Sequence, residues 1–220
     1  MLFSLDRGVI EIVVRSLQVT VSALTLSALI GIPAGVILAL SRFPGRRLIT
    51  TLIYTGMGLP PVVVGLAVYL LLSRSGPLGN WGWLFSMQAM IMGQTIIAVP
   101  LVAGVTMSSV LGVDPALRMQ IRAIGATRWQ STITMLYEAR FGVIVGLVAG
   151  FGAIISEVGA VMLVGGNIDG RTRVLTTAVV LETRQGNFDV ALALGIILLG
   201  LSFITNLIMV IGQGRAGETR

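Results

Sequence analysis

Five long apolar segments, separated by short charged stretches, constrain this chain more than any other feature of its sequence. A membrane-spanning helix needs about 20 apolar residues. Two uncharged runs, 16–41 and 48–73, exceed that length. We place three further spans at about 86–111, 141–164 and 190–213. The whole 220-residue chain is therefore expected to form a single transmembrane domain of the all-α class.

The composition excludes several kinds of chemistry. The chain is 55% apolar and only 11% charged, and it contains no His, no Cys and no Lys, so its fifteen basic residues are all Arg. Without these residues there is no Schiff base, no phosphate-binding GK[ST] loop, no thiolate, no imidazole base and no zinc or iron–sulfur site. We expect a non-enzymatic chain with no cofactor of its own. The arginines lie between apolar runs, which argues against nucleic acid as a partner.

The arginines also predict an orientation. Loops on the cytoplasmic side of a membrane are enriched in Lys and Arg. With the N-terminus outside, nine arginines fall inside and six outside, and the compact turn 42–47 carries three of the nine. We expect an outer N-terminus and a cytoplasmic C-terminus. No cleavable signal peptide is evident, because the first apolar run is too long. The inner loop is 112–140 and the outer loop, with a short amphipathic helix, is 165–189.

The inner loop 112–140 has clear helix-capping signals. Asp114 followed by Pro115 is typical of a helix start. Gly125 ends this helix, because glycine adopts a positive φ at little cost. Thr127 and Gln130 have the spacing of a capping box that opens a second helix, which we expect to run straight into the fourth span.

Two interpretations of this helix–glycine–helix segment remain open. It is either a well-capped connector between two spans or a docking element for a soluble partner, with the side chains Arg118, Arg122, Arg128 and Trp129 on its surface.

The spans contain candidate hinges. Adjacent prolines remove two backbone donors and interrupt a membrane helix, so Pro60 and Pro61 mark a hinge or a static kink. Pro100 is a weaker case. In the fourth span, Gly142, Gly146 and Gly150 form a small-residue face, which favours close helix packing and is also suited to meet a neighbouring subunit or to line a path.

Glu157 is the one acidic residue well inside an apolar run. An intramembrane carboxylate is costly and usually has a partner. We hypothesise that Glu157 pairs with Arg171 or Arg173 and holds an outer gate. Contact with a transported ion is the alternative.

Several motifs resemble one family of membrane proteins. Residues 121–129, followed by 135–140, resemble the EAA loop of permease subunits of type I ABC importers. Two positions depart from that pattern. Met119, Gln120 and Ile121 stand where the family has Glu-Ala-Ala, and Tyr137-Glu138 stand where it has a final Leu-Pro. Further motifs resemble the molybdate and tungstate permeases of that family, at residues 58–65 and 156–168, and the tungstate branch in particular, at residues 74–79 and 176–183.

This resemblance implies an ATP-driven oxyanion importer in a prokaryotic cell membrane, with tungstate as the expected ion and a molybdate or sulfate-type permease as the alternative. Its partners would be a second copy of the chain, two ATP-binding cassette subunits that bind ATP and Mg²⁺, an extracytoplasmic binding protein, and lipid. An ATP-independent channel or secondary transporter and an intramembrane enzyme are the rival classes, but the chain has neither paired intramembrane charges nor a catalytic pair at membrane depth.

Taken together, the residue patterns and the resemblance give candidate site residues in three regions. The ATPase-coupling set is Arg118, Arg122, Ala123, Gly125, Ala126, Thr127, Arg128 and Trp129. The hinge and gate set is Pro60, Pro61, Pro100, Glu157 and Gly159. The outer mouth, which would receive the loaded binding protein, comprises Gly165, Gly166, Asn167, Arg171 and Arg173.

Overall fold

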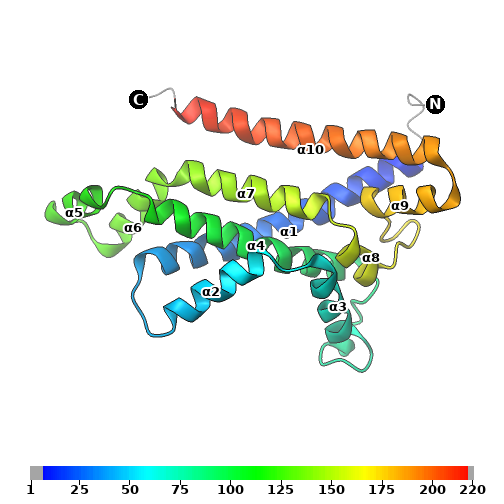
Figure 1. The fold of residues 1–220 in the computed structure, drawn as a ribbon, viewed down its shortest axis with the longest axis horizontal. Helices are drawn as coiled ribbons and strands as arrows, with labels where there is room; N and C mark the ends of the chain where they lie inside the picture. Colours follow the sequence, from blue (N-terminus) through cyan, green and yellow to red (C-terminus); the bar gives the residue numbers. More distant parts are fainter. Residues whose placement is uncertain (1–6, 218–220) are drawn as a thin grey trace.

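The structure is a computed structural model that describes residues 7–217, so the ends of the chain that enter the orientation argument, 1–6 and 218–220, lie outside the described residues. Figure 1 shows long helices running side by side along the longest axis of the molecule. They are α1 (Arg7–Leu40), α4 (Met87–Leu111), α7 (Arg140–Ile155) and α10 (Phe188–Gly217).

Shorter helices gather at the two ends and on one side of this bundle (Figure 1). One end holds α5 (Pro115–Ala123) and α6 (Arg128–Glu138), and the other holds α8 (Gly159–Gly165) and α9 (Leu175–Gln185). The side carries α2 (Arg46–Met57) and α3 (Pro61–Leu72), followed by the 3₁₀ turn η1 (Gly79–Trp81). Helix α1 begins at the α9 end, whereas α10 finishes at the end that holds α5 and α6.

The described helices fit an all-helical membrane protein. Three of them, α1, α4 and α10, are long and apolar enough to cross a membrane, and there are up to five spans if each of two bent helix pairs counts as one. Helix α1 starts at Arg7, well before the predicted residue 16, and its 34 residues extend about 51 Å. It therefore projects beyond a hydrocarbon layer of about 30 Å.

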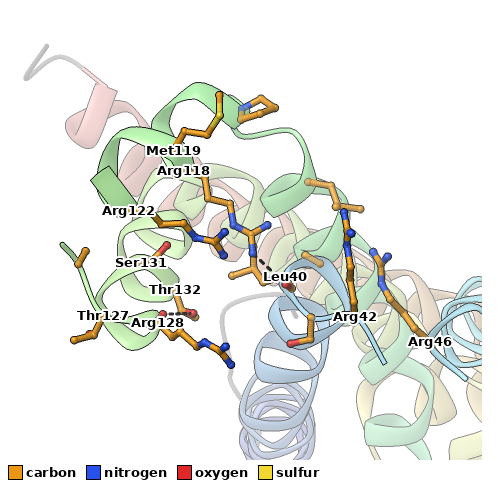
Figure 2. A pocket seen from close by; sticks show the side chains of 15 residues that line it. Leu40, Arg42, Arg46, Arg118, Met119, Arg122, Thr127, Arg128, Ser131 and Thr132 are labelled. Atoms are coloured by element: carbon orange, nitrogen blue, oxygen red, sulfur yellow. Dashed lines mark hydrogen bonds between the residues drawn. The ribbon is translucent and has the colours of Figure 1, made fainter. Parts of the chain in front are cut away.

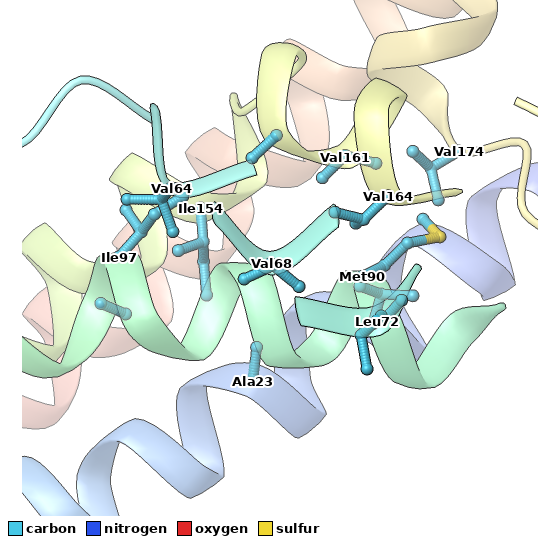
Figure 3. Close-up of a cluster of buried hydrophobic side chains, with 14 residues drawn as sticks. Ala23, Val64, Val68, Leu72, Met90, Ile97, Ile154, Val161, Val164 and Val174 are labelled. Atoms are coloured by element: carbon cyan, nitrogen blue, oxygen red, sulfur yellow. The ribbon is translucent and has the colours of Figure 1, made fainter. Parts of the chain in front are cut away.

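The main core lies where α1, α3, α4, α7 and α8 meet (Figure 3). Val68 of α3, Met90 of α4 and Val164 of α8 are among its fully buried side chains. A second core joins the ends of α1 and α4 to α5 and α6 through Val36, Met107 and other buried residues. The two cores fix opposite ends of the same pair of helices.

The predicted span 48–73 is two helices. Helices α2 and α3 meet at an angle of 107°, and the break falls at Pro60 and Pro61. Pro60 has an extended backbone (φ −61°, ψ 121°), and Pro61 occupies the first turn of α3. The interruption follows from the missing proline donors. Pro100, by contrast, lies inside an unbroken α4.

The expectation that the second inner helix runs straight into the fourth span is wrong. Helices α6 and α7 meet at 64°, with Ala139 between them. The Arg140 side chain donates a hydrogen bond to the Tyr137 carbonyl (2.9 Å) and lies 4.1 Å from the centre of the Tyr137 ring. This guanidinium satisfies a carbonyl near the end of α6 and so stabilises the bend.

The predicted span 141–164 is also broken, because α7 ends at Ile155 and α8 starts at Gly159. Glu157 lies in the break and is 9% exposed. Its carboxylate accepts a hydrogen bond from the backbone N–H of Ala160 (2.8 Å), and its carbonyl accepts one from Thr176 (3.0 Å).

The hypothesis that Glu157 pairs with Arg171 or Arg173 is therefore wrong. Arg173 pairs with Asp169 (3.0 Å), and Arg171 is exposed. The physical reason is local: a helix that restarts inside a membrane protein has unsatisfied N–H groups in its first turn. The carboxylate supplies the acceptor for one of them.

This capping role predicts different effects for two substitutions. Glu157→Ala removes the acceptor and should lower the free energy of unfolding by about 1 kcal/mol. Glu157→Gln keeps an acceptor oxygen and should cost less. Thermal denaturation of the detergent-solubilised chain measures both, with Ser156→Ala at the exposed neighbouring position as the control. Equal destabilisation by Gln and Ala would contradict the capping role and favour a charge interaction.

Candidate functional site

The segment between α4 and α7 folds as its capping residues predict. The Asp114 side chain accepts a hydrogen bond from the Ala116 N–H (2.8 Å) at the start of α5. Gly125 has φ +83° and forms the corner. The Thr127 hydroxyl accepts from the Gln130 N–H (3.3 Å), and the Gln130 side chain accepts from the Thr127 N–H (2.8 Å). The predicted capping box is confirmed.

One face of this segment is buried and the other is exposed. Ile121 and Met135 are 8% and 2% exposed and pack into the second core. Ile124 and Trp129, on either side of the Gly125 corner, are 84% and 72% exposed. Large apolar side chains at a rigid, exposed corner are suited to contact another protein. Ala123 and Thr127 are also exposed, whereas Ala126 is half-buried against the core.

Two arginines attach neighbouring segments to the end of α1. Arg118 of α5 donates to the carbonyl of Leu40 (3.1 Å), and Arg46 of α2 donates to the carbonyl of Leu38 (2.6 Å). The last carbonyls of a helix have no partner within the helix and carry a partial negative charge. Both guanidiniums therefore stabilise the end of α1. The sequence predicts Arg118 on a docking surface and indicates no individual role for Arg46.

A pocket of about 990 Å³ lies between this end of α1 and the helices α5 and α6. Figure 2 shows arginines of α5 and α6 on one side and those of the α1–α2 turn on the other. Among the described residues, no acidic residue lines this pocket. Five arginines do: Arg42, Arg46, Arg118, Arg122 and Arg128.

The breaks inside the predicted spans 48–73 and 141–164 lie against each other. Helix α3 packs against α8 so closely that a Cβ atom added to Gly65 would lie 2.5 Å from the Cα atom of Ala160. A Cβ atom added to Gly159 would lie 2.5 Å from Val62. Pro61 is the first residue of α3, and Glu157 lies just before α8. These two short helices touch each other. The structure brings the predicted hinge and gate residues together, with the exception of Pro100, which faces Gly56 of α2.

Sequence reasoning missed a residue at this junction. Gln94 of α4 is 4% exposed and donates a hydrogen bond to the Ile154 carbonyl (2.9 Å), one residue before the end of α7. The same carbonyl also accepts a hydrogen bond from the Glu157 N–H (3.3 Å), so Gln94 adds a second donor and joins α4 to the end of α7. The sequence signal that could have identified Gln94 is its position as a polar residue in the middle of an apolar span.

The loop between α8 and α9 is tied to α1 by Arg15 and Ser16, which lie at the start of the first predicted span. Arg15 donates to the carbonyls of Gly170 (2.9 Å) and Arg173 (3.2 Å), and the Ser16 hydroxyl accepts from the Leu175 N–H (2.8 Å). No local sequence signal links residues so far apart in the chain.

The predicted mouth residues belong to the same loop. Gly166 and Asn167 have positive φ values of 72° and 51°. The Gly165 carbonyl accepts a hydrogen bond from the Thr172 hydroxyl (2.6 Å). The two positive φ values and this hydrogen bond define a tight turn, in which Arg171 is exposed.

The glycines of α7 face α4 of the same chain. Cβ atoms added to Gly146 and Gly150 would lie 3.2 Å from Val105 and Val102, and Gly142 lies against Ser109. The structure thus uses this small-residue face inside the chain. Among residues 7–217, no group of three or more Asp or Glu residues is arranged to hold a metal ion.

Comparison with known proteins identifies the family. Residues 31–216 match the family described as "Binding-protein-dependent transport system inner membrane component". The chain is 45% identical over 197 residues to a probable anion ABC transporter permease protein of Haloferax volcanii, covering 87% of this chain and 85% of the relative. It is 37% identical to the tungstate uptake system permease protein TupB of Peptoclostridium acidaminophilum (95% and 92% covered). It is 30% identical to the molybdenum transport system permease protein ModB of Escherichia coli K12 (90% of each).

The fold agrees with this assignment. The inward-facing MetNI methionine ABC transporter superposes with a TM-score of 0.75 at 22% sequence identity, covering 95% of this chain and 98% of the transporter chain. The resemblance found in the sequence motifs is confirmed: the chain is an ABC transporter permease and belongs to the molybdate/tungstate/anion branch of that family.

Proposed function

We propose that this chain is the transmembrane permease of an ATP-driven oxyanion importer and that its ion is tungstate. It is the non-catalytic component of the importer. Tungstate is supported by relatives at 36–37% identity that are named for tungstate uptake, compared with 30% for a relative named for molybdenum transport. Two copies of the chain would form the path, with a separate ATPase on the inner side and a binding protein outside. The N-terminus would lie outside and the C-terminus in the cytoplasm.

The observation that carries the proposal is the rigid corner between α5 and α6. Its caps fix the two helices, Ile124 and Trp129 project from it, and Arg118 fastens it to the end of α1. An ATPase that grips this corner would therefore move α1 with it. At the opposite end, the loop held by Arg15 would lie outside and would meet a loaded binding protein.

In this mechanism, the meeting point of α3 and α8 acts as the gate. Helix α3 starts at the break after α2 and α8 at the break after α7, and their contact has no room for a larger side chain at Gly65 or Gly159. Movement of the inner end would separate or close the two helix starts. Selection of the ion would fall chiefly to the binding protein, because the described helices place no arginine at the α3–α8 contact.

The coupling role of the corner predicts the effect of Gly125→Val. A β-branched residue at φ +83° costs roughly 1–2 kcal/mol of backbone strain, so the corner should change its conformation. We expect the variant to insert into the membrane but to lose stimulated ATP hydrolysis in the assembled complex. Gly186→Val is the matched control, since Gly186 has φ +81° and open surroundings at the outer end of α9. Normal stimulation in Gly125→Val would contradict the coupling role.

The choice of ion predicts the outcome of a second experiment. The permease is reconstituted in vesicles with its ATPase, and its binding protein is added after loading with tungstate, molybdate or sulfate. We expect tungstate to give the largest stimulation of ATP hydrolysis. A larger response to molybdate or sulfate would replace tungstate as the ion while leaving the importer assignment intact.

A further inference from the structure

The arginine pocket at the inner end of the bundle contains more positive charge than the fold uses. Arg46 and Arg118 bond to carbonyls of α1. The other three, Arg42, Arg122 and Arg128, are exposed, and their side chains have no hydrogen bond or ion pair within the described part of the chain. Like charges that share a pocket repel one another. A pocket of this kind is stabilised when an anion occupies it.

The position of the pocket indicates where that anion comes from. The pocket is bordered by Leu40, the last residue of α1, and Leu111, the last residue of α4. The 25 residues of α4 extend about 37 Å, compared with about 30 Å for the hydrocarbon layer. With α4 centred on the hydrocarbon layer, Leu111 would lie a few ångströms beyond it, at the depth of the lipid headgroups.

The border of the pocket suits a lipid better than a free ion. Leu111 and Met119 are 52% and 66% exposed beside the arginines. Apolar side chains at the edge of a basic pocket provide a surface for the glycerol and the first acyl carbons. Guanidinium groups bind phosphate oxygens in a bidentate manner, and basic pockets beside membrane helices on the cytoplasmic side bind acidic lipid headgroups.

We propose that this pocket binds the phosphate group of an acidic phospholipid. Arg42, Arg122 and Arg128 contact the phosphate, while Arg46 and Arg118 keep the end of α1 in place beneath it. Within residues 7–217, the side chains of Arg42, Arg122 and Arg128 form no hydrogen bond that links the α1–α2 turn to α5 and α6. The bound lipid would provide this link. The proposal concerns lipid binding and is independent of which oxyanion is imported.

The test compares two triple variants of the full chain. One carries Arg42→Gln, Arg122→Gln and Arg128→Gln. The control carries Arg47→Gln, Arg74→Gln and Arg184→Gln, which remove the same charge from exposed arginines outside the pocket. Native mass spectrometry of the detergent-solubilised permease, without ATPase, measures retention of cardiolipin, phosphatidylglycerol and phosphatidylcholine.

We expect the pocket variant to bind the acidic lipids on the order of 100-fold more weakly and the control to bind them normally. Phosphatidylcholine should bind equally weakly to all three proteins. Equal losses in the two variants would overturn the proposal in favour of general charge attraction. Sodium tungstate and inorganic phosphate are titrated in parallel without lipid. Binding of either ion that depends on the three pocket arginines, with no change in lipid retention, would assign the pocket to a free oxyanion instead.

Because the measurement omits the ATPase, its failure would be distinct from a failure of coupling. A pocket that binds no lipid leaves the Gly125 corner and its role untouched. Circular dichroism of each variant confirms that the helices form, so a loss of lipid is assigned to the pocket and not to unfolding.

Discussion

The close approach of α1 and α4 is the contact on which the rest of the structure depends. A Cβ atom added to Gly35 would lie 2.5 Å from the carbonyl oxygen of Ala103, so the two backbones touch. Lipid tails are as apolar as the side chains, and membrane helices therefore associate through packing that small residues permit. The two cores lie on this helix pair, one at each end, and α2, α3, α7 and α8 all pack on α4.

Broken spans create a second requirement, because hydrocarbon offers no partner for a free backbone group. The chain provides side-chain partners at the break after α7, one from α4 and one from the break itself. At the end of α7, Gln94 donates to a carbonyl, and Glu157 accepts from an N–H of α8. Both polar side chains thus form hydrogen bonds with backbone groups at the break. This explains how an acidic residue is kept at membrane depth without a basic partner.

The sequence was informative where structure is local and uninformative where it is not. Asp114, Gly125 and Thr127 act within a few residues, so their pattern predicted α5, the corner and α6. The proline pair predicted the break between α2 and α3 for the same reason. Arg15 and Gln94 bond to groups far away in the chain, and no periodicity reveals such contacts. Glu157 was assigned an arginine partner from charge pairing alone. Its actual partner is a backbone N–H in the first turn of α8.

In the proposed importer, the end of α1 would serve as a shared pivot. Arg118 fixes the α5–α6 corner to it, and Arg46 fixes the start of α2 to the same final turn. Helix α2 has 12 residues and is about 18 Å long, and its far end is Met57, beside the proline break. A turn of 10° about the pivot would carry that far end by about 3 Å, roughly the separation of two packed atoms. In the proposed mechanism, these two hydrogen bonds would set the lever arm by which a small rotation at the end of α1 becomes a displacement at the contact between α3 and α8.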